Sequence, residues 1–170
     1  MSWSRRSRPI ALAAILLATG AALGACSFSP VYSGALASQP LLNLAYAKPN
    51  SRLEQVVYQE LALRLGSSTS ETAPLATVSV SSSAGGLGFL TSTANPSKPY
   101  RVTVTATLTI ARRDGSDIEP ISFTRRATAE YTANSQVLAD TTAATEATER
   151  AAKAAAESLR LAVLAALSRG

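Results

Sequence analysis

The chain has 170 residues, 46% of them hydrophobic and only 5% aromatic, and carries a formal net charge of +5 at pH 7. It contains no histidine and a single cysteine, which excludes a Ser-His-Asp triad, an imidazole metal site and an internal disulfide. No block of Lys and Arg interleaved with aromatic residues occurs, so the charge does not indicate a nucleic-acid-binding protein.

The first 25 residues have the pattern of a secretory signal peptide. Arg5, Arg6 and Arg8 precede an apolar stretch, residues 10–23, that is too short for a comfortable membrane span. Because Cys26 directly follows small residues, this site resembles the lipobox of bacterial lipoproteins, which implies diacylglycerol on the thiol, cleavage before the cysteine and acylation of the new amino group. An ordinary signal peptide beside a chance cysteine is the alternative. Cleavage takes three arginines from the 16 basic side chains and leaves 13 against 11 acidic ones.

A tether and a short strand are expected to follow the cleavage site. Residues 26–40 are small and polar with two prolines, which is typical of a linker leading away from a lipid. Residues 41–46 then alternate loosely between apolar and polar side chains, which predicts a short strand that ends before Pro49.

The next segment has the clearest helix signals in the chain. Ser51 and Glu54 have the spacing of a capping box, and Gly66 stands where a left-handed C-terminal cap is expected. The apolar residues between them recur at every fourth position, at Leu53, Val57, Leu61 and Leu65. We therefore expect a helix that buries one stripe.

Three strands are predicted in the middle of the chain. Val78 and Val80 alternate with serines and lead to residues 85–88, Gly-Gly-Leu-Gly, where no Lys follows, so a flexible strand end is favoured over a phosphate-binding loop. Residues 101–111 alternate regularly between apolar side chains and threonines, as a half-buried antiparallel strand does. Asp114-Gly115 predicts the hairpin turn, and the return strand, residues 121–131, is expected to contain a bulge where Arg125 interrupts its apolar face.

An alanine-rich helix is predicted over residues 140–168. Its charged side chains gather on one arc, and alanines such as Ala147, Ala151 and Ala155 lie opposite, so the small face can lie close to a sheet. The elements in order predict an α+β fold: a four-stranded, mostly antiparallel sheet, order β-α-β-β-β-α, with two helices packed on one face. The other sheet face, rich in threonine, serine and arginine, would be open to water or to a partner.

The residues after the expected lipid anchor resemble the F-x-P-x-Y-G opening of LptE, the lipopolysaccharide-assembly lipoprotein family, particularly its alphaproteobacterial branch. The matching residues are Phe28, Pro30, Tyr32 and Gly34, although Ser33 is inserted before the glycine. The order of elements is also similar, so the resemblance covers the tether and residues 41–170, where it implies an LptE-like α/β sandwich domain.

This resemblance implies a function. It is that of an outer-membrane lipoprotein, lipid-anchored at the periplasmic face, that plugs and helps to assemble the LptD β-barrel and assists lipopolysaccharide transport to the cell surface. Ser27 is compatible with sorting to the outer membrane, since the usual retention signal at that position is Asp. A polar sheet face suits a wet barrel interior. No enzyme activity, cofactor or metal is implied.

Five arginines are candidates for contact with lipopolysaccharide phosphates, because guanidinium groups bind phosphate in forked geometry. They are Arg101, Arg112, Arg113, Arg125 and Arg126. The two doublets flank the Asp114-Gly115 turn, so we expect strand pairing to bring them within reach of each other. Solubility and pairing with nearby carboxylates are the alternative roles.

Two other functions are weighed against this one. An auxiliary lipoprotein of a phospholipid ABC-type transporter would be expected to carry an apolar lipid groove in place of a polar sheet face. A Ser-Lys hydrolase would need Lys48, Lys98 or Lys153, none of which lies in a recognisable motif.

Overall fold

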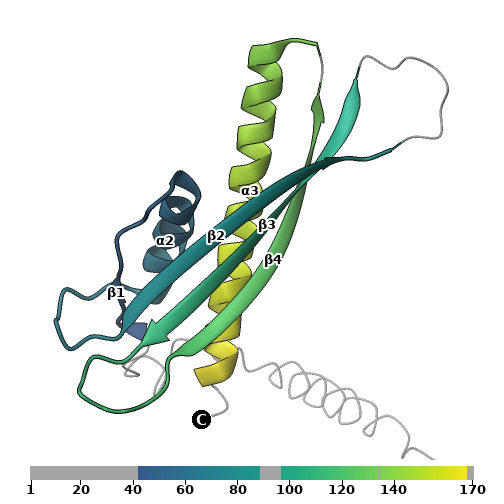
Figure 1. Cartoon of the computed structure of the whole chain (residues 1–170). Helices are drawn as coiled ribbons and strands as arrows, with labels where there is room; N and C mark the ends of the chain where they lie inside the picture. The colour runs from purple at the N-terminus through teal and green to yellow at the C-terminus, as the bar shows by residue number, and fades with distance from the viewer. Residues whose placement is uncertain (1–41, 89–96, 134, 168–170) are drawn as a thin grey trace, which may run out of the picture. The chain divides into compact units, whose positions relative to one another are not determined.

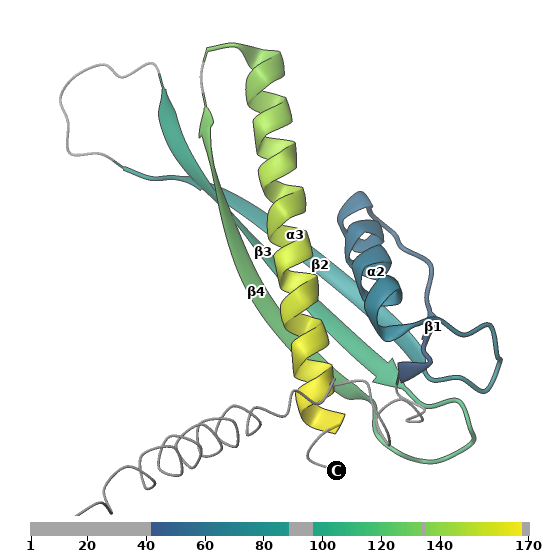
Figure 2. The same ribbon diagram turned by 180° about the vertical axis from the view of Figure 1, so that it is seen from behind.

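Four strands form one sheet in the order β1-β2-β3-β4, and two helices cover one of its faces (Figures 1 and 2). The elements are β1 (Ala45–Tyr46), α2 (Arg52–Leu65), β2 (Leu75–Gly86), β3 (Lys98–Ala111), β4 (Ile121–Ala133) and α3 (Val137–Leu167). The computed structural model describes residues 42–88, 97–133 and 135–167, all within the unit Ala35–Gly170. The expected signal peptide, Cys26 and the tether of residues 26–40 lie outside the described residues. The predicted α+β class and element order are confirmed.

Strand pairing is mostly antiparallel. β1 pairs with β2 in parallel, only at Ala45 and Tyr46, and is shorter than predicted. The chain leaves the sheet there because Pro49 and the N-cap of α2 follow within five residues. β2 pairs with β3, and β3 with β4, antiparallel along their lengths.

The expected bulge at Arg125 is wrong. Arg125 pairs with Ala106 in the same uninterrupted register as the residues on either side of it. The strand tolerates arginine among its apolar positions because β4 is an edge strand, where the side chain stays exposed and donates to the backbone oxygen of Thr124 at 2.8 Å. The charge of Arg125 therefore keeps its own side chain exposed and leaves the backbone pairing between β3 and β4 intact.

The connection between β3 and β4 is longer than a tight hairpin. β3 ends at Ala111 and β4 begins at Ile121, so Asp114-Gly115 lies inside a loop. Gly115 adopts a φ of 80°, which glycine reaches without steric cost, and the Asp114 carboxylate accepts from the Ser116 backbone N–H. The hydrogen bonds from Ser116 hold the pKa of Asp114 below its usual range.

α2 begins and ends as its sequence indicates. The Ser51 hydroxyl accepts from the Glu54 backbone N–H at 3.2 Å, and the Glu54 carboxylate accepts from the Asn50 N–H at 2.6 Å. Gly66 closes α2 with a φ of 79° and donates to the Ala62 oxygen. α3 begins at Val137, three residues before the predicted start.

The core lies between the helices and one face of the sheet. β3 contributes its even-numbered residues, from Val102 to Ile110, and α2 contributes Val57 and Leu61. α3 faces them with fully buried alanines, among them Ala147, Ala151 and Ala155. Small side chains let the α3 axis lie close to the sheet, so the core is thin and closely packed. No helix in the described ranges is long and apolar enough to cross a membrane.

Candidate functional site

The side of the sheet turned away from both helices carries a continuous field of hydroxyl side chains, which we call the open face. It is built from alternate residues of three adjacent strands. These are Thr77, Ser79, Ser81, Ser83 and Gly85 of β2, Arg101, Thr103, Thr105, Thr107 and Thr109 of β3, and Ser122, Thr124, Arg126, Thr128 and Glu130 of β4.

The alternation of β3 creates this face. Its even-numbered residues are buried under α2 and α3, so its threonines must point to the opposite side. The register then places Ser79 and Thr124 on either side of Thr107, and Ser81 and Arg126 on either side of Thr105. The hydroxyls therefore lie in rows across the sheet.

Neighbouring strands are connected by these side chains. The Oγ1 atoms of Thr107 and Thr124 lie 2.9 Å apart, and the next row brings Thr109 Oγ1 within 3.3 Å of Ser122 Oγ. Each exposed cross-strand pair of this kind contributes about 0.2–1 kcal/mol. Some hydroxyls of the open face bond to one another, but each still has donor or acceptor positions left for hydrogen bonds with another surface.

At one end of the open face, an ion pair between Arg101 and Glu130 follows the rows of hydroxyl side chains. Arg101 donates through Nε and Nη2 to the same carboxylate oxygen of Glu130, at 3.1 and 2.6 Å. Both side chains are about half exposed, so water screens the pair and its contribution to stability is about 0–1 kcal/mol. The guanidinium is therefore held in place at little energetic cost and remains accessible.

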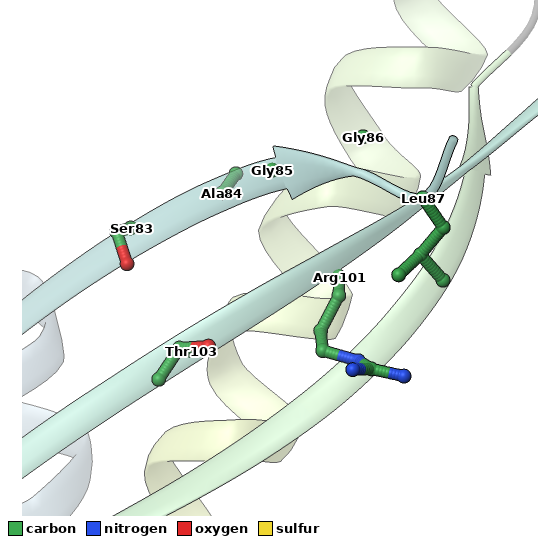
Figure 3. A pocket seen from close by; sticks show the side chains of 7 residues that line it. All are labelled: Ser83, Ala84, Gly85, Gly86, Leu87, Arg101 and Thr103. Atoms are coloured by element: carbon green, nitrogen blue, oxygen red, sulfur yellow. The ribbon is translucent and has the colours of Figure 1, made fainter.

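A shallow hollow of about 290 Å³ lies beside Arg101 (Figure 3). It is lined by Ser83, Ala84, Gly85, Gly86, Leu87, Arg101 and Thr103. The backbone at Gly85 has open space where a Cβ would stand, and its φ is not positive, so glycine here provides room without relieving strain. The predicted flexible strand end is in fact paired with β3 as far as Gly86.

The five candidate arginines do not form one cluster. Arg101 and Arg126 share the open face, with Arg126 donating to Thr105 Oγ1 at 3.3 Å. Arg125 lies on the opposite face of β4. Arg112 and Arg113 follow β3 at the far end of the sheet, where Arg112 pairs with Asp114 and Arg113 donates to the Ala73 oxygen at 3.1 Å.

The expectation that the two doublets approach each other is wrong. Arg125 is opposite Ala106, and Arg112 lies six residues farther along the chain, just past the end of β3. At about 3.3 Å per residue this separates the doublets by roughly 20 Å along the strands. A two-residue turn at Asp114-Gly115 would place Arg125 opposite Val104, still farther from Arg112 than Ala106 is, so the separation does not depend on the length of the β3–β4 loop.

The lysines considered for hydrolysis are exposed and lie on three separate segments. Lys48 follows β1, Lys98 begins β3 and Lys153 is on α3. Within residues 42–88, 97–133 and 135–167, no group of three or more His, Cys, Asp or Glu side chains could hold a metal ion.

Sequence reasoning missed Glu130 and the β4 hydroxyls as members of the open face. Ser122, Thr124 and Thr128 occupy alternate positions of β4, between the apolar residues assigned to the other face. Their period of two was therefore visible in the sequence, but the strand register that places them beside the β3 threonines was not.

Comparison with known proteins agrees with this architecture. A family model described as lipopolysaccharide-assembly, LptE, matches residues 42–163. A solved structure described as a lipoprotein from Caulobacter crescentus aligns with a TM-score of 0.52 at 21% identity, covering 76% of this chain and 93% of that one. The rare lipoprotein B from Shewanella oneidensis aligns with a TM-score of 0.51 at 17% identity, covering 75% and 92%. A minor lipoprotein from Acinetobacter baumannii aligns with a TM-score of 0.52 at 16% identity, covering 72% of this chain and 89% of that one. A search of curated proteins gives no match.

Proposed function

This chain belongs to the LptE lipopolysaccharide-assembly family, and from that premise we propose that it is a lipoprotein of the outer membrane that plugs an LptD-like β-barrel. In this role it helps the barrel to assemble and assists the passage of lipopolysaccharide to the cell surface. Cys26 carries the lipid anchor, and the domain works at the periplasmic face of the membrane. Each buried methylene of an acyl chain contributes about 0.8 kcal/mol, so several chains together anchor the protein stably.

The open face is the observation that carries this proposal. The interior wall of a large β-barrel is polar and wet, so a plug must exchange many hydrogen bonds with it at small desolvation cost. Ser79, Ser81 and Thr124 are exposed and offer hydroxyls that both donate and accept. Such a surface can therefore pair with donors and with acceptors on a polar barrel wall.

The phospholipid-transporter alternative is not favoured. That function calls for an apolar groove, whereas the described sheet is apolar only on the face that α2 and α3 already cover. The family match over residues 42–163 supports lipopolysaccharide assembly instead.

Lipopolysaccharide contact is the finer part of the proposal. Arg101 and Arg126 stand on the same surface as the hydroxyl rows, where a phosphate could accept from a guanidinium and from neighbouring hydroxyls together. Arg125, Arg112 and Arg113 lie elsewhere, so any contact they make with lipopolysaccharide is separate. Replacing Arg101 and Arg126 by serine should weaken binding of purified lipopolysaccharide, and replacing Arg112 and Arg113 should do so much less.

Affinity purification tests the plug. The full-length protein with a C-terminal tag is expressed in its own envelope, solubilised in mild detergent and captured. A large outer-membrane barrel should copurify, and Thr107→Trp should reduce its yield, because the indole stands out from the centre of a flat surface while tryptophan suits a strand. Thr142→Trp, on the exposed side of α3, is the matched control and should leave the yield unchanged. A wild-type protein captured without any barrel would contradict the proposal.

A further inference from the structure

The two long edges of the sheet differ in how their backbone groups are used. Even-numbered residues of β4 point their backbone groups outward, since the Thr124 oxygen accepts from the side chain of Arg125 and the Glu130 oxygen from that of Arg150 in α3, and neither is used by the sheet. The register then requires that the backbone groups of even-numbered β2 residues point outward at the opposite edge of the sheet. The hydrogen bond from the Val78 N–H to the Tyr58 hydroxyl agrees with this direction.

The β4 edge is protected by arginines. Arg125 donates to the Thr124 oxygen at 2.8 Å, and Arg150 of α3 donates to the Glu130 oxygen at 3.1 Å. Charged side chains that occupy edge carbonyls are a common means of preventing further strand pairing.

Among the described residues, the β2 edge is protected only at its beginning. The N–H groups of Ala45 in β1 and of Ala47 just after it donate to the Pro74 and Ala76 oxygens. The Val78 N–H donates to the Tyr58 hydroxyl at 2.8 Å. Both views show β2 continuing past β1 and α2 (Figures 1 and 2). In the part of the chain that the structure describes, no hydrogen bond reaches the outward backbone groups of residues 80–86.

The side chains along this stretch leave the edge accessible. Residues 80–86 are Val-Ser-Ser-Ser-Ala-Gly-Gly, without charge, proline or bulge, and six of the seven are exposed. Sheets usually defend so long an edge with lysine, proline or a covering element. An edge with small side chains on both faces instead admits a strand whose own side chains are larger.

We propose that residues 80–86 bind an extended, uncharged segment of the barrel partner. This segment adds a fifth strand to the sheet, beside the part of β2 that continues beyond β1. This inference rests on the proposed plug function and assigns a second contact beside the open face. The added strand would pair with the outward groups of Val80, Ser82 and Ala84 and would extend the polar surface by one strand.

A second copy of this chain fits the edge less well. Two β2 edges could pair about a twofold axis, but Ser82 and Ala84 on one side and Ser81 and Ser83 on the other are small and exposed, so little apolar surface would be buried. A stable dimer buries about 1,200–2,000 Å² in total, far more than such a strip offers. A segment of a partner already bound through the open face has a high effective concentration and needs less contact area.

Matched edge prolines test the inference. Ser82→Pro removes one outward N–H and places a ring at the β2 edge, and Thr132→Pro makes the same change at an outward, exposed position of β4 beyond the rows of the open face. Proline is tolerated at such edge positions, so both variants should fold, which circular dichroism checks. In the copurification described above, Ser82→Pro should lower the barrel yield about tenfold or more. The variant loses the hydrogen bond from the residue 82 N–H to the added strand, and the proline ring clashes with that strand. Thr132→Pro should keep the wild-type yield.

Each outcome decides a different point. Equal yields from the wild type and both prolines would overturn the added strand and leave the plug intact. A wild type that captures no barrel would overturn the plug and this inference with it. A photo-crosslinking residue at position 82 adds an independent measurement. A crosslink to the barrel supports the inference, and a product of twice this chain's mass would show that a second copy occupies the edge and would overturn it.

Discussion

Two neighbouring tyrosines provide a sharp test of how the edge of the core is held. Tyr46 and Tyr58 pack edge to face with ring centroids 5.9 Å apart. The Tyr58 hydroxyl accepts from the buried Val78 N–H at 2.8 Å, whereas the buried Tyr46 hydroxyl has no partner among the described residues. Burial raises the pKa of both hydroxyls. The same change, tyrosine to phenylalanine, should therefore have opposite effects at the two positions.

Tyr58→Phe leaves the Val78 N–H without its acceptor. An unsatisfied buried backbone group costs about 1–3 kcal/mol, so we expect a loss of about 2 kcal/mol in the free energy of unfolding. For a unit of this size roughly 4 °C accompanies each kcal/mol, which predicts a melting temperature about 8 °C lower. Tyr46→Phe removes a buried hydroxyl that makes no hydrogen bond, so stability should stay equal or rise by about 1 kcal/mol.

Thermal and urea unfolding, followed by circular dichroism on both variants and the wild type, measures the difference. Equal destabilisation by the two substitutions would refute the reasoning, because both variants keep the aromatic ring and only the Tyr58 hydroxyl has a hydrogen bond to lose. An intact urea m-value in all three proteins would establish that the comparison concerns one native state.

Three further predictions concern the helices. Ala155→Leu should destabilise the protein by about 1–3 kcal/mol in urea unfolding, because the side chain is fully buried against the sheet, and Ala154→Leu on the exposed side of α3 should change little. The hydrogen bond from Arg160 holds the pKa of Glu157 below its usual range, so its contribution exists above the unfolded-state pKa and disappears as pH falls through the folded-state value. Glu157→Gln should accordingly flatten the acid limb of stability against pH, and an unchanged slope would contradict this role. Gly66→Ala should cost about 1 kcal/mol, since alanine is strained at the φ of 79° that closes α2, and an equally stable variant would show that the cap relaxes.

Local signals predicted the regular elements well. The capping residues of α2, the period-two alternation of β3 and the alanine face of α3 each follow from contacts between residues close in sequence. The placement of both helices on one side follows in turn, because each has one apolar stripe to bury.

The features that were mispredicted depend on long-range geometry. β1 contains only two residues, since its extent is decided by where β2 lies and not by its own alternation. Arg125 interrupts the apolar pattern, yet pairing across the whole of β3 and β4 keeps the backbone regular at that point. The arginine doublets lie apart because Arg125 pairs with Ala106, whereas Arg112 stands six residues later, just past the end of β3.

The candidate site was predicted in composition but not in layout. The threonine side of β3 indicates a polar surface by itself, while its extension over β2 and β4 requires the register of three strands. The lack of charge and proline in residues 80–86 is visible in the sequence, but the exposure of this edge is not, because it depends on where β1 stops.

Site-specific photo-crosslinking tests most directly whether the open face meets a barrel. A crosslinking residue replaces Thr107 at the centre of the open face, or Leu63, which is 81% exposed on α2, and cells producing the full-length lipoprotein are irradiated. A product joining this chain to a large outer-membrane barrel from position 107, stronger than from position 63, is the predicted result. Absence of any such product from position 107, with the protein present in the envelope, would contradict the account.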